Sequence, residues 1–229
     1  MQIDVNSIPI ITIDGYSASG KGTLCKKLND ILNWNILYSG NIYRVLALKL
    51  LGKSFLKLNI EEILNLIKKL IIKFERKEKF IKTVCNGRDL TKDIQKEDVV
   101  MLASKISCIK EVRDSLLIYQ RKFLNPPGLI AEGRDLGTVV FPNASIKIFL
   151  NTSLKKRAKR RKKQLKFFGI NEDLKKILKN MKERDEIDKK RNFSPTKPAK
   201  DALIFDSGKL KVNKIIERII FHMKNIINV

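Results

Sequence analysis

The sequence predicts an α/β fold in which helices cover both faces of a parallel sheet. Three observations predict it: short buried-strand patterns recur along the chain, helical patterns fill the intervals, and the first strand runs into a glycine-bounded loop followed by a helix. Parallel strands need crossover connections, which place helices on the sheet faces. With 229 residues, the chain can bury the core of a single domain, 1–229.

Five short apolar segments are the predicted strands: Pro9–Ile13, Asn35–Tyr38, Leu129–Ala131, Ile146–Leu150 and Ala202–Phe205. After the first strand, apolar residues recur at helical spacing from Leu24 to Leu32, and Asn33 lies where this pattern ends. The predicted sheet therefore begins with a strand–loop–helix unit.

A long insertion lies between the second and third strands. It contains a helical pattern over Glu61–Ile71, a strand-like alternation over Lys73–Val84 and a turn at Asn86-Gly87. The pattern then predicts one polar-rich helix over Asp98–Leu124, which ends before Pro126. An insertion of this size beside a ligand loop is a natural place for a second substrate to bind.

The loop after the first strand has the residue types of a phosphate-binding loop. Gly15 and Gly20 permit backbone angles that a β-carbon disfavours, so successive N–H groups can surround an anion. The next helix directs its positive end to the same place, and Lys21 can reach the β- and γ-phosphates. The predicted nucleoside triphosphate site is Gly15, Tyr16, Ser17, Ala18, Ser19, Gly20, Lys21, Gly22 and Thr23.

Gly22 departs from the strict motif, which has Ser or Thr after the lysine. Thr23 can contact a phosphate, but the usual hydroxyl ligand for Mg²⁺ is missing, so no direct metal ligand from a side chain is predicted. A chance glycine-rich turn is the alternative. The strand before the loop and the helix after it favour the nucleotide site.

Two charged clusters follow in the C-terminal half. In the helical pattern Leu154–Phe168, eight of the nine residues from 155 to 163 are basic, which fits either a solvated face or a nearby anion. Arg184, Asp188 and Arg191 share one face of a second predicted helix. Guanidinium groups suit bidentate phosphate recognition, although ordinary helical ion pairs explain this spacing equally simply.

The net charge is +24, from 48 basic and 24 acidic side chains. Such an excess fits a polyanionic partner or compositional drift, and the scattered lysines without a nucleic-acid-binding module favour drift. No apolar run is long enough for a bilayer, no export signal surrounds Asp4, and three cysteines show no metal-like spacing. We therefore expect a cytoplasmic protein without a specific nucleic-acid or membrane partner.

Several further motifs, in order, resemble the bacterial cytidylate kinase family over nearly the whole chain. They are Ser39-Gly40-Asn41-Ile42-Tyr43-Arg44, Ala103-Ser104, Val112-Arg113, Pro127–Pro142 with its Gly133-Arg134-Asp135-Leu136-Gly137-Thr138 run, Lys182-Glu183-Arg184-Asp185 and Asp206-Ser207. The resemblance implies a P-loop NTPase fold with a five-stranded parallel sheet, a monophosphate-binding region at 39–124 and a mobile lid at 155–166. The core would be 1–38, 125–154 and 167–229, and the protein a monomer.

The resemblance also implies ATP-dependent phosphorylation of CMP and dCMP, with Mg²⁺ accompanying ATP. It implies that CMP is bound by Ser39, Arg44, Ser104, Arg113, Arg134, Asp135, Arg184, Asp188 and Arg191. The expected catalytic residues are Lys21, Arg157, Arg160 and Arg161, the last three carried by the lid.

Three positions depart from the family pattern. Tyr16 replaces a proline, Tyr38 replaces an aspartate, and Glu132 replaces an aspartate. We expect these changes to tune the rate without removing activity. A uridylate- or adenylate-preferring kinase, a regulatory GTPase and a nucleic-acid-binding protein are the alternative functions.

Overall fold

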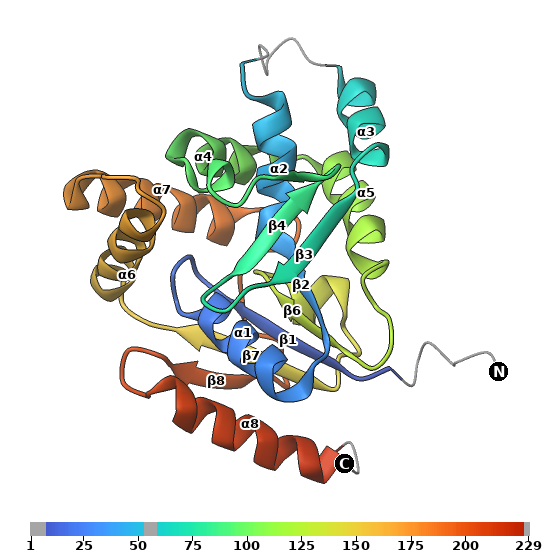
Figure 1. Ribbon diagram of the computed structural model, residues 1–229, viewed down its shortest axis with the longest axis vertical. Helices are drawn as coiled ribbons and strands as arrows, with labels where there is room; N and C mark the ends of the chain where they lie inside the picture. The colour runs from blue at the N-terminus through green and yellow to red at the C-terminus, as the bar shows by residue number, and fades with distance from the viewer. Residues whose placement is uncertain (1–7, 53–58, 227–229) are drawn as a thin grey trace, which may run out of the picture.

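The computed structural model describes residues 8–52 and 59–226, and it contains the predicted five-stranded parallel sheet (Figure 1). The strands are β1 (Ile10–Gly15), β2 (Asn35–Tyr38), β6 (Leu129–Glu132), β7 (Ile146–Asn151) and β8 (Leu203–Asp206), in the spatial order β2-β6-β1-β7-β8. Every neighbouring pair is parallel, so the carboxyl ends of all five strands lie at one edge. Asp4, around which the sequence shows no export signal, lies outside the described residues.

Helices cover both faces of the sheet, as the sequence predicted. On one face, α1 (Lys21–Leu32) and α8 (Val212–Ile226) pack over a core that includes Ile11 and Ile13 of β1. On the other face, α2 (Ser39–Leu50) and α5 (Lys110–Arg121) pack over a core that includes Ile10. Successive side chains of a strand point to opposite faces, which explains this division. Asn33 ends α1 with a left-handed φ of 53°, as predicted.

The insertion folds as helix α3 (Ile60–Lys68), a small antiparallel sheet and helix α4 (Glu97–Ile106) before α5. The alternation over Lys73–Val84 forms two strands, β3 (Ile72–Arg76) and β4 (Ile81–Cys85), and β5 (Arg88–Asp89) completes the sheet. The predicted turn at Asn86-Gly87 is confirmed. Both residues have positive φ, 49° and 79°, as a tight two-residue hairpin turn requires.

The prediction of one helix over Asp98–Leu124 is wrong, because α4 and α5 are separate helices. The Ser107 hydroxyl donates to the Ser104 carbonyl over 2.7 Å, and Arg113 donates to the Ser107 carbonyl over 3.1 Å. These bonds stabilise a bend that periodicity does not reveal, since the apolar pattern continues on both sides. The bend brings Ser104 and Arg113 to one place.

The predicted basic segment 155–166 lies within α6 (Leu154–Phe167), which packs against α7 (Leu174–Lys190) through Leu165, Ile177 and Met181. In Figure 1 the arrowheads of β7 and β8 point toward the side of the molecule where α6 and α7 lie. None of the helices in the described ranges is both long and apolar enough to cross a membrane.

Replacing Gly15 with alanine is expected to lower the free energy of unfolding by more than about 2 kcal/mol. The new β-carbon would lie 2.2 Å from the Leu150 carbonyl oxygen, at a φ of +139°. Gly87→Ala is the matched control, because its φ is also positive, +79°, but its β-carbon would meet open space. Urea denaturation measures both, and equal losses would contradict a steric cause.

Candidate active site

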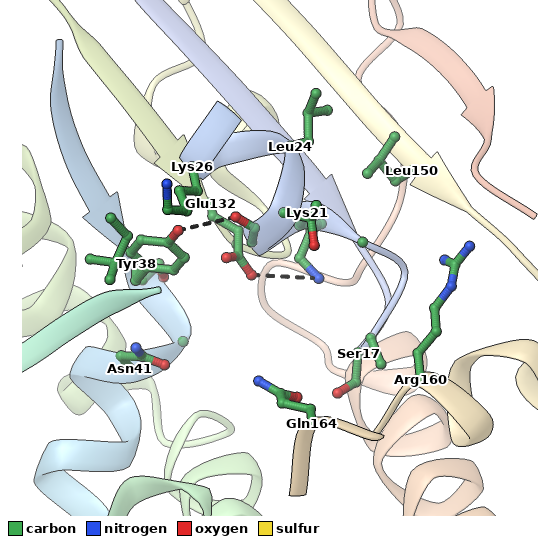
Figure 2. Close-up of a pocket in the computed structure, with 18 of the residues that line it drawn as sticks. Ser17, Lys21, Leu24, Lys26, Tyr38, Asn41, Glu132, Leu150, Arg160 and Gln164 are labelled. Carbon is green, nitrogen blue, oxygen red and sulfur yellow. Dashed lines mark hydrogen bonds and ion pairs between the residues drawn. The ribbon is translucent and has the colours of Figure 1, made fainter. Parts of the chain in front are cut away.

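A cavity of about 1320 Å³ lies at the edge where the five parallel strands end. Its walls include the loop after β1, the first turns of α1 and α2, the tip of the β3–β4 hairpin, and side chains of α4, α6 and α7. Figure 2 shows Lys21, Glu132, Arg160 and Gln164 around part of this space. Segments far apart in the sequence thus contribute to one site, as expected at the carboxyl ends of parallel strands.

The loop after β1 has the geometry of an anion site. Gly20 precedes α1 with a left-handed φ of 101°, and Ala18 is also left-handed at 57°. Lys21 is the first residue of α1, only 3% exposed, and its Nζ donates to the Tyr16 carbonyl over 2.8 Å. Burial first, and then the nearby Arg134 guanidinium, lower the pKa of Lys21 to about 7. A bound polyphosphate would oppose this shift, because a nearby anion favours the charged ammonium.

Glu132, at the end of β6, is the carboxylate beside the lysine. Its Oε1 lies 3.8 Å from Lys21 Nζ (Figure 2), and its Oε2 would lie 3.3 Å from a β-carbon at Gly22. The hydroxyl of Tyr38 donates to the Gly22 carbonyl over 3.3 Å. A carboxylate oxygen therefore lies beside the position at which the strict motif would bring a Ser or Thr hydroxyl.

This arrangement fits Mg²⁺ bound mainly by phosphate oxygens and water. In the described ranges no group of three or more His, Cys, Asp or Glu side chains could hold a metal ion. Mg²⁺ commonly uses one or two carboxylates together with substrate phosphates, and Glu132 offers one hard oxygen donor at this place.

The three arginines of α6 have different surroundings. Arg160 lines the cavity, and its guanidinium donates to the Ser19 carbonyl over 3.1 Å and to the Ser207 carbonyl over 2.6 Å. Arg157 is buried and donates to the Asp185 carboxylate and to the Ser17 carbonyl.

Arg161 is 1% exposed and donates to Gln95 over 2.7 and 2.8 Å. Neither Arg157 nor Arg161 is among the residues that line the cavity. In this conformation they hold α6 in place, and Arg160 is the α6 arginine that faces the predicted donor.

A buried polar cluster also borders the cavity. The Arg113 guanidinium donates to the Asp135 carboxylate, and both side chains are less than 10% exposed. Ser39 and Ser104 are also buried, and the Ser104 hydroxyl has no hydrogen-bond partner within the described residues. Buried polar groups normally have partners, so this cluster is suited to a polar ligand such as a nucleobase.

Arginines dominate the middle of the cavity, between the loop and the polar cluster. Arg134 donates to Asp188 and to the Gly15 carbonyl, each over 2.9 Å. Arg44 is surrounded by other guanidinium groups; burial first, and then Arg161, Arg184 and Arg134, lower its pKa to about 9. Uncompensated positive charge of this kind favours an anionic ligand.

Arg184 and Arg191 complete this group from α7 and its C-terminal end. Arg191 donates to the Ser107 hydroxyl over 3.1 Å and lies 3.8 Å from the Asp188 carboxylate. Arg184, Asp188 and Arg191 all line the cavity. The predicted helix face holds for Arg184 and Asp188 only, because α7 ends at Lys190 and Arg191 follows with a non-helical ψ of 132°.

Sequence reasoning missed several residues that shape the site. Asp14 accepts hydrogen bonds from Leu136 N and Gly137 N, over 3.0 and 2.8 Å, and so fixes the loop that follows Asp135. Burial raises the pKa of this carboxyl to about 7. Gln95 and Glu97 contact arginines from three helices, and no sequence pattern marked them. Ser207 bonds to the Ser19 carbonyl, and the Asp206-Ser207 motif was the available signal for it.

Comparison with known proteins agrees with this geometry. The family model for cytidylate kinase matches residues 11–225. The chain is 43% identical to the cytidylate kinase of Photobacterium profundum over 90% of this chain and 91% of that protein. It is 42% identical to the cytidylate kinase of Pectobacterium atrosepticum, over 96% and 97% respectively, and 43% identical to that of Sodalis glossinidius, over 96% of each.

Solved structures that align with the chain are more distant. A deoxyadenosine kinase from M. mycoides is 15% identical over 94% of this chain and 98% of that chain, with a TM-score of 0.41. The assignment therefore comes from the sequence relatives and the family match. This chain belongs to the cytidylate kinase family and is a nucleoside monophosphate kinase.

Proposed function

We propose that this protein transfers the γ-phosphoryl group of ATP to the 5′-phosphate of CMP and dCMP, giving CDP and dCDP in the cytoplasm. The observation that carries the proposal is that a phosphate-binding loop and a buried Arg113–Asp135 pair border the same cavity, with arginines between them. The names of the relatives support the acceptor.

The chemistry needs alignment and cationic charge more than a strong base. The acceptor phosphate is already ionised at neutral pH, and the one histidine, His222, lies on α8 and does not line the cavity. Lys21 and the loop amides would hold the donor. Because the transferred group carries charge on its equatorial oxygens, fixed cations around it lower the barrier.

The acceptor phosphate would be held in line by Arg44, Arg134 and Arg184, with Arg160 closing the donor side. Holding two reactants in one geometry removes much of the entropic cost of their encounter. Mg²⁺, bound with ATP, would neutralise charge on the donor phosphates, and Glu132, beside Gly22 and Lys21, would orient its water ligands. Asp188 would accept from the sugar hydroxyls, with Arg191 beside it.

Recognition of cytosine is a matter of hydrogen-bond matching. The exocyclic amine of cytosine is a donor that Asp135 can accept, and Arg113 can donate to the ring nitrogen or carbonyl. Ser39 and Ser104 border the same end of the cavity. Uracil presents the reverse pattern at this edge, and each buried group left unpaired costs about 1–3 kcal/mol.

We further propose that the segment 155–166 moves as the lid, that 39–124 is the monophosphate-binding region, and that the remainder is the core of a monomer. The orientation of α6 supports the first point, since one of its arginines faces the donor loop and another faces the acceptor region.

A coupled assay with ATP and each of CMP, dCMP, UMP and AMP tests the proposal. We expect CMP and dCMP to give kcat/KM values at least about tenfold above those of UMP and AMP. Absence of CDP in the presence of Mg²⁺ would refute it. Preference for UMP or AMP would indicate a different monophosphate kinase, and GTP hydrolysis without an acceptor would indicate a GTPase.

A further inference from the structure

Gln95 occupies a central position between the acceptor side of the cavity and α6. It lies at the end of a single helical turn, Asp93–Gln95, is 5% exposed and lines the cavity. Its side-chain Oε1 accepts from Arg44 Nη1 over 3.2 Å and from Arg161 Nη1 over 2.8 Å. Its main-chain oxygen accepts from Arg161 Nη2 over 2.7 Å. One residue therefore contacts an arginine of α2 and an arginine of α6.

Glu97 supplies negative charge at the same place. Its carboxylate lies 3.7 Å from Arg161 Nη2 and 3.3 Å from Arg184 Nη2. Burial lowers the pKa of both arginines, to about 10 for Arg161, and the carboxylate of Glu97 opposes this shift. Glu97 thus offsets part of the burial cost and the mutual repulsion of these two guanidinium groups.

Arg161 contributes to this cluster and not to the cavity wall. It is 1% exposed, and it donates a further hydrogen bond to Gln164 on its own helix over 3.1 Å. A charged side chain buried this deeply requires its partners, because a buried guanidinium without them would be uncompensated. Its departure would also leave the main-chain oxygen of Gln95 without this donor. The contact between Arg161 and Gln95 is therefore specific to the position that α6 occupies here.

On the donor side, α6 is held through a different arginine. Arg160 donates to the carbonyl of Ser19 in the phosphate loop, and Gly20 lies beside the same guanidinium. Donor phosphates bound in the loop would attract Arg160 and so favour this position of α6. The same position brings Arg161 to Gln95, whose amide oxygen then holds Arg44 toward the acceptor.

We propose that Gln95 is a positioning residue that couples the two substrate sites: its amide oxygen is shared by Arg161 of α6 and Arg44 of the acceptor side, so ATP and CMP each strengthen the binding of the other. This inference rests on the proposed function, because it assumes these two substrates. Coupling between binding sites is reciprocal, and typical values are about 5- to 150-fold.

Steady-state kinetics over a grid of ATP and CMP concentrations, together with CMP titration with and without a non-hydrolysable ATP analogue, tests the inference. In the wild-type protein we expect CMP affinity to rise about fivefold or more when the donor site is filled. In Gln95→Leu, which keeps the bulk and removes the acceptor, we expect this ratio to fall below about twofold. Gln95→Glu keeps the oxygen acceptors and is expected to retain the coupling.

The matched control is Gln120→Leu. Gln120 is also a buried glutamine, 2% exposed, but it lies on α5 and donates to the Leu116 carbonyl. It should leave the coupling unchanged. If Gln95→Leu does not fold, Glu97→Gln gives a second test, because it keeps the shape, removes the charge and should weaken the coupling.

Asp98→Asn controls for charge in the first turn of α4, since Asp98 accepts only from its neighbour Val99 N within the described residues. Three results would overturn the inference. Gln95→Leu could keep the wild-type coupling, Gln95→Leu could lose kcat alone, or the wild-type protein itself could show no coupling. An enzyme with no CMP kinase activity would instead refute the proposed function.

Discussion

Lys21→Ala is expected to lower kcat with ATP and CMP by about a hundredfold or more, the usual effect of removing a group that stabilises transition-state charge. Lys21 begins α1 inside the phosphate loop, and its ammonium is buried between the Tyr16 carbonyl and the Glu132 carboxylate. A side chain this enclosed cannot be replaced by a solvent-exposed lysine. A coupled assay at saturating ATP and CMP measures the effect.

Lys105→Ala provides the control for loss of one positive charge, because Lys105 is exposed in the last turn of α4 and does not line the cavity. It should retain the wild-type kcat. Thermal unfolding of Lys21→Ala would establish that the variant is folded. Near-normal turnover in the folded variant would exclude Lys21 from the mechanism.

Asp135→Ala is expected to reduce the preference for CMP over UMP, measured as the ratio of the two kcat/KM values, by about tenfold or more. The change removes the acceptor for the cytosine amine and leaves the Arg113 guanidinium without its buried carboxylate. Activity with CMP should fall more than activity with UMP. A ratio equal to that of the wild type would exclude Asp135 from base recognition.

Two further variants make this test specific. Asp135→Asn keeps the shape and adds an amide donor, so we expect it to improve UMP relative to CMP. Asp114→Ala removes a carboxylate that pairs with Lys110 on the exposed side of α5 and should leave the ratio unchanged. A matching change in Asp114→Ala would indicate a general effect of charge instead of recognition by Asp135.

Much of the donor side of the site could be predicted locally. The strand, loop and helix around Gly15–Lys21 are consecutive, so the residue types and their order define the backbone path almost completely. Arg184 and Asp188 border one cavity for the same reason, because positions four apart share a helix face. Arg191 also lines the cavity, although it follows the end of α7. Their roles in binding the acceptor stay predictions.

Sequence reasoning missed the features that depend on contacts between segments distant in sequence, and it predicted one helix where the structure has two, α4 and α5. The bend that separates α4 from α5 results from bonds among Ser104, Ser107 and Arg113, which a periodic apolar pattern does not encode. The sequence identified Tyr38 only as a departure from the family pattern. Its hydrogen bond to the Gly22 carbonyl depends on the packing of β2 beside α1, which the sequence does not show.

The sequence by itself determined the parallel sheet, the phosphate loop at its edge and the family, because each of these depends on residue types at short, fixed spacings. Only the tertiary structure decided which arginine of α6 faces the donor and which are buried against Asp185 and Gln95. The physical reason is that three neighbouring arginines on one helix have the same local chemistry. They differ in the carbonyl or carboxylate that accepts from each of them. Those partners come from segments distant in sequence, and only the folded chain brings them to the helix.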